Sequence, residues 1–259
     1  MPLKFLISVC LALTFTTASY AVPLLDWSDW SPSFNSGSLA PQSINLSGTQ
    51  TITYSPGTTG ATSFLFGTPD IFIDSPPAFP FNGTGGTADH YLDLYQDNNL
   101  PGEGSTHSFT FSDPVDNVSI EFWDLDANNS GTNNYVDEVT VTATLLGGAV
   151  VNPTYGTIAN PGIVTQSSPN TWSGIPFVSS DDNTNNGNVE VVFGYDDIVQ
   201  VDVSFVNSTV GPTPAVLSGN HAIGLYNIEQ DVAVVPTPFG ASLGLMGLTL
   251  MIFGLRHCV

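Results

Sequence analysis

Acidic and amide side chains alternate at one turn of the chain in a pattern that suits a hard cation. Asp124, Asp126 and Asn128 are spaced two residues apart, and Asp137 opens the next extended segment. Calcium takes several oxygen ligands, which such a turn can supply from carboxylates, amides and backbone carbonyls. We therefore expect these four residues to form a Ca²⁺ site. The alternative is that Asp and Asn only make the turn and stay solvated.

The spacing at this turn begins like an EF-hand loop, with the D-x-D-x-N order. Asn129 stands where that loop needs glycine, and Tyr135 stands at the twelfth position, where it needs glutamate. An EF-hand is therefore excluded, and the expected site lies at the edge of a different fold.

Catalysis has little support among the residues. Three histidines could act as bases, but no nucleophile elbow, zinc-binding helix or Cys–His arrangement accompanies His90, His107 or His221. Among 23 acidic residues, some pair with the separation of a glycosidase is expected by chance. We therefore expect no enzyme, and a secreted polysaccharide-active enzyme is kept as an alternative.

Aromatic and hydroxyl residues raise the alternative of a carbohydrate-binding module. Trp172 stands among Ser, Pro, Asn and Thr, which predicts an exposed platform on which a sugar ring could stack. Trp123 lies in an alternating segment and is expected in the core. Thr140, Thr142 and Thr144 alternate with apolar residues, which predicts the wet face of a single strand.

The candidate residues named above are predicted to lie on strands or in the turns between them. Apolar and polar residues alternate with period two in seven segments, which indicates strands with one buried and one wet face. These segments are residues 49–54, 107–111, 117–123, 139–145, 189–193, 199–206 and 222–232. Long polar loops between them favour an all-β fold, a two-sheet antiparallel sandwich of jelly-roll type. Asp89, Asp93 and Asp97 recur every four residues, for which we expect a short helix or a loop.

Charge is distributed unevenly along the chain. The two basic residues, Lys4 and Arg256, lie near the ends, and all 23 acidic residues lie between Asp26 and Asp231. Nothing in that stretch can meet a phosphate, so nucleic acid is disfavoured as a partner. Compensating positive charge must come from metal ions, counterions or a basic partner. Both cysteines, Cys10 and Cys258, also lie near the ends, which predicts a body without disulfides.

The first residues predict a secretory signal peptide. Lys4 supplies a positive start, residues 5–15 form a short apolar core, and small residues precede a cleavage point after Ala21. The apolar core is too short to span a bilayer. We expect residues 1–21 to be removed by signal peptidase.

The opposite end predicts a membrane anchor. Residues 239–255 are uncharged and rich in glycine, and as a helix they would reach about 25 Å. Arg256 follows, which places the basic end in the cytoplasm and the body outside.

This end also resembles a known family of sorting signals. Val235, Pro236, Thr237 and Pro238, followed by the apolar helix and Arg256, are similar to the PEP-CTERM signal of Gram-negative bacteria, a segment also labelled an ice-binding protein C-terminal domain. The resemblance implies that an exosortase in the inner membrane cuts near the proline motif and delivers the body to the surface or matrix. Thr237 replaces the usual glutamate, and one arginine with a histidine replaces the usual basic cluster.

Together these patterns predict three parts: a signal peptide (residues 1–21), a β-sandwich body (22–234) and a sorting signal (235–259) whose helix crosses the inner membrane transiently. We expect an exported, non-enzymatic protein of the cell surface or biofilm matrix. Its role would be structural or adhesive, with Ca²⁺ bridging it to acidic extracellular polysaccharide.

Overall fold

The structure, a computed structural model, describes residues 19–25, 27–30, 34–45, 50–60, 63–64, 69–74, 89–98, 100–130, 133–179, 186–208 and 219–233. The chain divides into two compact units, Met1–Tyr20 with Val232–Val259, and Ala21–Asp231. Most of the expected signal peptide and all of the expected helix at residues 239–255 lie outside the described residues. Within those residues, no helix has the length and apolar character needed to cross a bilayer.

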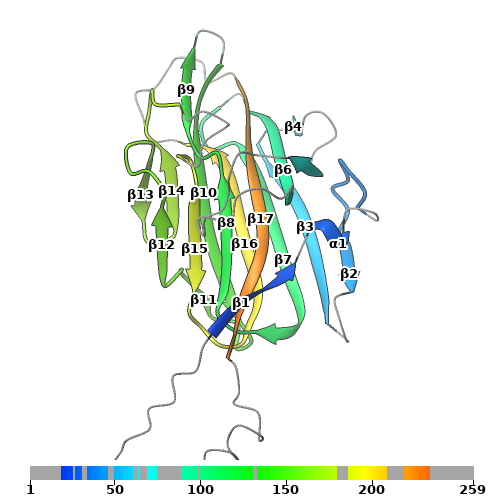
Figure 1. The fold of residues 1–259 in the computed structure, drawn as a ribbon. Coiled ribbons are helices and arrows are strands. Elements are labelled where there is room, and N and C mark those ends of the chain that lie inside the picture. Colours follow the sequence, from blue (N-terminus) through cyan, green and yellow to red (C-terminus); the bar gives the residue numbers. More distant parts are fainter. Residues whose placement is uncertain are drawn as a thin grey trace, which may run out of the picture. The chain divides into compact units, whose positions relative to one another are not determined.

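The second unit is all-β, with two antiparallel sheets packed as a sandwich (Figure 1). One sheet has the order β12 (Tyr155–Ile158), β15 (Val189–Phe193), β8 (Val118–Trp123), β17 (Gly219–Ala233), β6 (Asp89–Asn98) and β4 (Ser63–Phe64). Two further strands join it, β1 (Ser19–Leu25) on β17 and β5 (Asp70–Asp74) on β6. We call it the eight-stranded sheet.

The other sheet has nine strands. Its order is β13 (Val164–Ser168), β14 (Thr171–Gly174), β10 (Asn133–Leu145), β16 (Ile198–Asn207), β7 (Gly104–Val115), β3 (Thr51–Thr59) and β2 (Gln42–Asn45). The short strands β9 (Ala127–Ser130) and β11 (Val150–Val151) pair with β10. A single helical turn, α1 (Trp27–Trp30), precedes β2.

Eight strands pair in a nested order. In chain order they are β6, β7, β8, β10, β14, β15, β16 and β17. The first pairs with the eighth, the second with the seventh, the third with the sixth and the fourth with the fifth. These pairs belong alternately to the eight-stranded and the nine-stranded sheet. The path is that of one long hairpin folded over on itself.

The core lies between the inward faces of the two sheets. In β8, Val118, Ile120 and Phe122 point inward and are buried, whereas the residues that alternate with them are half-buried. Aromatic side chains supply much of the core volume, and each fully buried one contributes roughly 1.5–3 kcal/mol of hydrophobic stabilisation. The largest are Trp27, Trp30, Trp172, Tyr54, Phe109, Phe122, Phe193 and Phe205.

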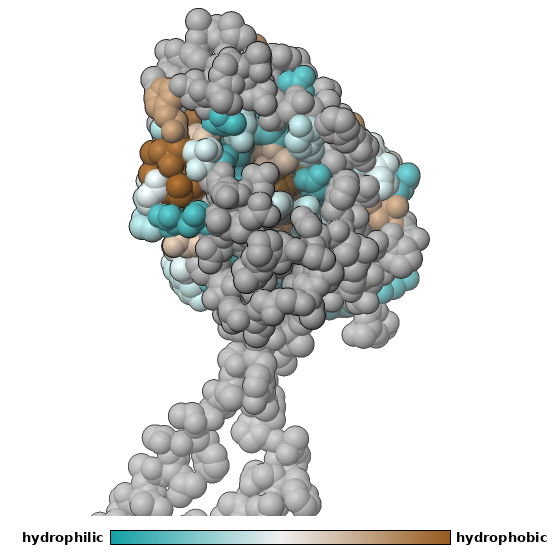
Figure 2. All heavy atoms as spheres, turned by 45° about the horizontal axis from the view of Figure 1, so that its top comes forward, coloured by the Kyte–Doolittle hydropathy of each residue, from teal (hydrophilic) through white to brown (hydrophobic). Residues whose placement is uncertain are grey.

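Few large apolar side chains are exposed among the described residues. In the view of Figure 2, brown surface is gathered mainly at one side, and much of the remaining coloured surface is teal or pale. The exposed large apolar residues are Leu39, Leu100, Leu146, Val150, Tyr155 and Phe177.

The expected all-β sandwich is confirmed, and the described part of each of the seven alternating segments falls on a strand to within one residue at its start. One expectation about local structure is wrong. Asp89, Asp93 and Asp97 lie on strand β6, not on a helix or loop. A spacing of four is a multiple of the strand period of two, so it also places residues on one face of a strand.

Candidate functional site

The acidic turn follows directly after β8. Asp124 has a left-handed backbone (φ 65°), and the next residue, Leu125, is fully buried. The Leu125 N–H donates to the carbonyl of Gly187 at 3.0 Å. Gly174 and Gly187 are needed here, because a Cβ at either position would press on the backbone of this turn. Burial of Leu125 and these close approaches hold the turn against the end of the sandwich.

An aspartate and a histidine meet between the two sheets near this turn. Asp137 lies on β10 opposite Asn207, and His221 lies on β17 opposite Gln96. The imidazole Nδ1 of His221 is 2.5 Å from Asp137 Oδ1, and both side chains are almost completely buried. Because β10 and β17 belong to different sheets, this contact joins them across the core.

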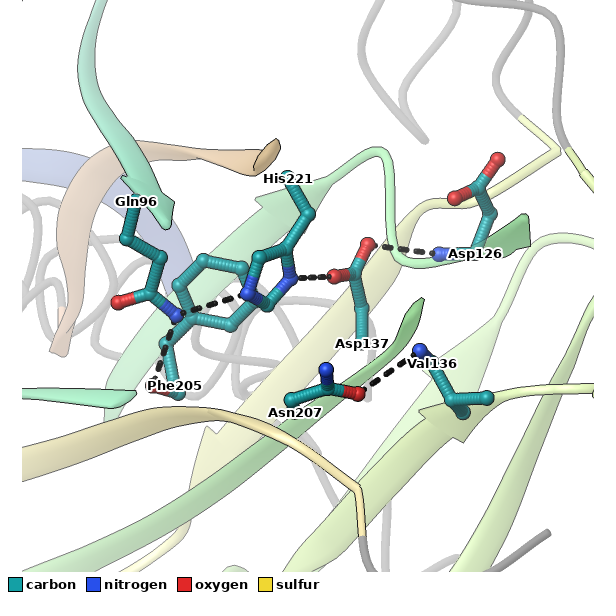
Figure 3. Close-up of polar contacts among 7 residues, drawn as sticks. All are labelled: Gln96, Asp126, Val136, Asp137, Phe205, Asn207 and His221. Atoms are coloured by element: carbon teal, nitrogen blue, oxygen red, sulfur yellow. Dashed lines mark hydrogen bonds and ion pairs between the residues drawn. The ribbon is translucent and has the colours of Figure 1, made fainter. Parts of the chain in front are cut away.

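Backbone and amide groups extend the contact on both sides, and Figure 3 shows Gln96, His221, Asp137 and Asp126 in a row. Gln96 Nε2 donates to the Phe205 carbonyl at 3.2 Å and lies 3.4 Å from His221 Nε2. At the other end, the N–H of Asp126 donates to Asp137 Oδ2 at 3.3 Å. We call these residues the buried Asp–His network.

The donors around His221 determine where its proton lies. Gln96 Nε2 can only donate, so His221 Nε2 accepts and the ring proton sits on Nδ1. Nδ1–H then donates to Asp137, whose two oxygens both act as acceptors.

Burial dominates the electrostatics of the network. The pKa of Asp137 is raised well above its usual value, first by desolvation and then by the charges of Asp126 and Asp124. Desolvation also lowers the pKa of His221 to about 3. Tyr135, whose ring stacks on His221 with centroids 5.3 Å apart, has its pKa raised by burial and by the same three carboxylates. Negative charge is therefore concentrated here without a cationic side chain to balance it.

The structure brings three of the four predicted Ca²⁺ ligands into one electrostatic cluster: Asp124, Asp126 and Asp137. Asn128 lies on β9 and pairs with Tyr135 of β10. Both oxygens of Asp137 already accept hydrogen bonds. Within the described part of the chain, no three His, Cys, Asp or Glu side chains are arranged to hold a metal ion. The cluster is thus not a finished coordination shell in this conformation.

The expectation of an exposed platform at Trp172 is wrong. Trp172 is fully buried and lies on β14, where its register partner on β10 is the buried Val139. Its indole packs against Gly156 of β12, where any side chain would collide with the ring. Thr171, Trp172 and Ser173 alternate polar, apolar, polar, a short strand signal that the surrounding turn residues obscured.

Sequence reasoning missed Gln96 and Tyr135 as members of the site. In both segments, the sequence does not show which polar residues face the core and which face solvent. That assignment requires the strand register. His221 was considered only as a base. Its burial excludes a direct contact with a substrate in this conformation.

A second closed polar group lies inside the nine-stranded sheet. Tyr54 and Ser105 hydrogen bond to the two ring nitrogens of His107, each at 2.8 Å. All three side chains are fully buried. Desolvation lowers the pKa of His107 to about 3, so the ring stays neutral.

The predicted sorting motif, residues 235–238, and Arg256 lie outside the described residues, so the structure adds nothing to them.

Comparisons with known proteins add little. No family model matches the chain, and no curated protein matches it. Among solved structures, the chain is similar to the bacteriophage CBA120 tailspike protein 4 enzymatically active domain, at 12% identity and a TM-score of 0.35. That match covers 70% of this chain but only 19% of the tailspike chain. A likeness at this level carries no functional argument.

Proposed function

We propose that this protein is exported across the inner membrane of a Gram-negative bacterium and, after its tail is cut by an exosortase, serves at the cell surface or in the extracellular matrix. The observation that carries the proposal is the pairing of an apolar signal at each end with a central stretch that has no Lys or Arg. In support, one compact unit spans Ala21–Asp231, close to the expected cleavage points.

We infer further that the sandwich is of jelly-roll type. Eight strands that pair first with eighth, second with seventh, third with sixth and fourth with fifth support this topology. Jelly rolls occur among lectin and capsid domains, so the topology is compatible with a structural or adhesive role and assigns no activity.

We propose that Ca²⁺ binds at the acidic turn and strengthens the body. Asp124, Asp126 and Asn128 would supply oxygens, together with backbone carbonyls. Asp137 would act mainly through its charge, because its oxygens are held by His221 and by the Asp126 amide. Desolvation and the neighbouring carboxylates of Asp126 and Asp124 raise the pKa of Asp137. A bound cation would oppose this shift, because it favours the ionised form.

Processing is tested in the producing cell. The C-terminus of the surface protein is identified by mass spectrometry, with and without the exosortase gene. We expect a cut near residues 235–238 in the wild type, and uncut, membrane-bound protein in the deletion strain and in Pro236→Ala. Identical tails in both strains would overturn the sorting proposal and leave a tail-anchored protein.

Calcium binding is tested on the full chain by thermal unfolding with Ca²⁺ or with a chelator. At a Ca²⁺ concentration of about 100 Kd, mass action stabilises the folded state by roughly 2.7 kcal/mol. The double variant Asp124→Ala, Asp126→Ala should lose this rise, and Asp196→Ala, an exposed aspartate elsewhere, should keep it. No rise in the wild type would sink the calcium proposal and leave the sorting proposal intact.

A further inference from the structure

The outward face of the nine-stranded sheet is a two-dimensional array of hydroxyl groups. On β10, β16, β7 and β3, inward residues are apolar or fully buried, and outward residues are half-buried or exposed. We call this surface the hydroxyl face. Its residues are Ser43, Thr53, Ser55, Thr106, Ser108, Thr110, Thr140, Thr142, Thr144, Thr171, Gln200, Asp202 and Ser204.

Strand register arranges these residues in rows that cross the sheet. One row runs Thr171, Thr140, Ser204, Thr106; the next runs Thr142, Asp202, Ser108, Ser55; the third runs Thr144, Gln200, Thr110, Thr53, Ser43. The third row crosses five strands. At a strand spacing of about 4.8 Å it is roughly 19 Å long.

Hydrogen bonds between neighbouring strands orient these side chains in advance. The hydroxyls of Ser43 and Thr53 are 2.9 Å apart, and those of Thr140 and Thr171 are 3.0 Å apart. A hydroxyl has one donor and two acceptor positions, so each retains capacity for a partner. Side chains that are already ordered lose less entropy on binding.

The charge of the face differs from that of the whole protein. The formal net charge of the chain is −21, but Asp202 is the one carboxylate in these three rows. The next outward residue of β10, Glu138, lies in the adjoining row opposite Val206 and accepts a hydrogen bond from the Ser208 hydroxyl at 2.7 Å. Gln200 Nε2 donates to both oxygens of Asp202 at 2.8 Å, and the Ser108 hydroxyl donates at 2.5 Å. A partner on this face therefore meets hydroxyls and amides, whereas an acidic polymer would be repelled by the protein as a whole.

We propose that the hydroxyl face binds a neutral polysaccharide laid across the strands, through hydrogen bonds between its hydroxyls and the rows of Ser, Thr and Gln. No position in the rows is aromatic, so the sugar rings are held at their edges. This inference rests on the proposed location at the surface or matrix and names the partner class there.

A rigid lattice such as ice fits the same face less well. Adjacent strands in a sheet rotate by about 20–25° relative to one another, so the rows are not coplanar over five strands. A flexible polymer can follow this twist, whereas a crystal plane cannot. The polymer is therefore the occupant that the twist favours.

The test measures retardation of the full chain in native gels containing dextran, a soluble β-glucan or alginate. We expect retardation by at least one of the two neutral polymers and none by acidic alginate. The triple variant Thr53→Val, Thr110→Val, Thr144→Val keeps side-chain shape but removes a row of hydroxyls. It should weaken binding about tenfold or more, given the usual contribution of three hydrogen bonds.

Two controls separate a binding role from a structural one. Thr53→Ser, Thr110→Ser, Thr144→Ser retains the hydroxyls and should bind within about twofold of wild type. Ser119→Ala with Thr157→Val removes hydroxyls from the eight-stranded sheet and should leave retardation unchanged. Unfolding midpoints identify any variant that fails to fold, in which case the serine set and single valine variants carry the comparison.

Several outcomes would overturn the inference. These are no retardation by either neutral polymer, equal retardation of the valine triple variant, binding to alginate alone, or slowed ice growth without polymer binding. None of them bears on the exosortase experiment, so failure of this inference and failure of the proposed function are distinguishable.

Discussion

The outer faces of the two sheets are built from the same alternating pattern but carry different chemistry. On the eight-stranded sheet, Tyr91 of β6, Trp123 of β8 and Tyr226 of β17 pack together on the side away from the core. The expectation that Trp123 lies in the core is therefore wrong: it is half-buried and alternates with the inward Phe122. Tyr91 and Tyr226 are less than one-tenth exposed. On the nine-stranded sheet, the corresponding positions are the Ser, Thr, Gln and Asp of the hydroxyl face, which remain half-buried or exposed.

A glycine makes the aromatic face compact. Gly224 pairs with both Asp93 and Trp123, and a Cβ there would lie 2.9 Å from a ring carbon of Trp123 and 3.0 Å from one of Tyr91. The rings of Tyr91 and Trp123 meet edge to face at 5.5 Å, a favourable geometry for aromatic pairs. The aromatic face thus acts as a second small core, whereas the hydroxyl face keeps its polar groups available.

The largest expected effect concerns the core between the two faces. His107 and His221 have folded pKa values of about 3, against about 6.5 when unfolded. Below pH 6.5 the unfolded chain therefore binds protons that the folded chain does not, so stability is lost as the pH falls from 6.5 towards 3. The full loss is on the order of 5 kcal/mol per histidine.

Urea midpoints between pH 7 and pH 5 check this prediction, in a window where most carboxylates stay ionised. His107→Gln should reduce the slope of stability against pH by about half. A flat profile in both the wild type and Asp137→Asn, which lacks the opposing titration of Asp137, would show that neither imidazole is held neutral. It would contradict the buried geometry on which the comparison of the two faces rests.

Truncation of one residue on each face compares directly how tightly the two faces are packed. Tyr91→Ala should lower the free energy of unfolding by about 3 kcal/mol, because it opens a cavity among packed rings. Thr142→Ala on the hydroxyl face should cost less than about 1 kcal/mol. Chemical denaturation measures both, and equal costs would show that the hydroxyl face is as tightly packed as the aromatic one.

Asp137 is expected to act in the opposite direction from the histidines. Its folded pKa lies above the usual value of 3.8, so the stability it contributes is present below pH 3.8 and is lost as the pH rises through the folded pKa. Asp137→Asn removes this titration and should change stability at neutral pH by no more than about 1 kcal/mol.

In contrast, Asp137→Ala leaves the donors of His221 and Asp126 without an acceptor and should cost about 2 kcal/mol. Thermal unfolding at pH 7 compares the two variants. If Asp137→Asn lowers the free energy of unfolding as much as Asp137→Ala does, the charge of Asp137 is essential to the network. That result would contradict the interpretation that the negative charge of this cluster is not balanced by a cation.

The smallest effect is expected on the surface. Thr142→Val should change the free energy of unfolding by no more than about 0.5 kcal/mol, since the side chain keeps its shape and faces outward. Urea unfolding measures this change. A larger loss of stability would mean that the Thr142 hydroxyl contributes to folding and that the hydroxyl face has a structural role.

Much of the fold could be predicted because strand alternation is a local signal. The Val-Thr-Val-Thr-Ala-Thr run of residues 139–144 predicts a strand with one apolar and one hydroxyl side. This prediction does not require knowledge of the strands that pair with it. The clustering of Asp124, Asp126 and Asp137 was also predictable, because a turn and the start of the next strand are close in sequence. Their geometry was not, since the oxygens of Asp137 accept hydrogen bonds from the backbone of Asp126 and from His221, a residue that the sequence did not connect to this site.

The remaining parts depended on contacts between distant segments. Trp172 is buried because β14 pairs with β10 and because Gly156 of β12 leaves room for the indole. His221 meets Asp137, and Gln96 meets His221, only because β17 and β6 lie across the core from β10. No local pattern carries that information.

Strand alternation, the lack of Lys and Arg between the ends, and the signals expected at both termini can all be recognised in the sequence alone. These properties are local or compositional, so they do not depend on how the chain folds. Which strands are neighbours is known only from the fold. That pairing turned single threonine ladders into a continuous hydroxyl face and brought a carboxylate and an imidazole together in the core, because strand register joins residues that are far apart in the chain.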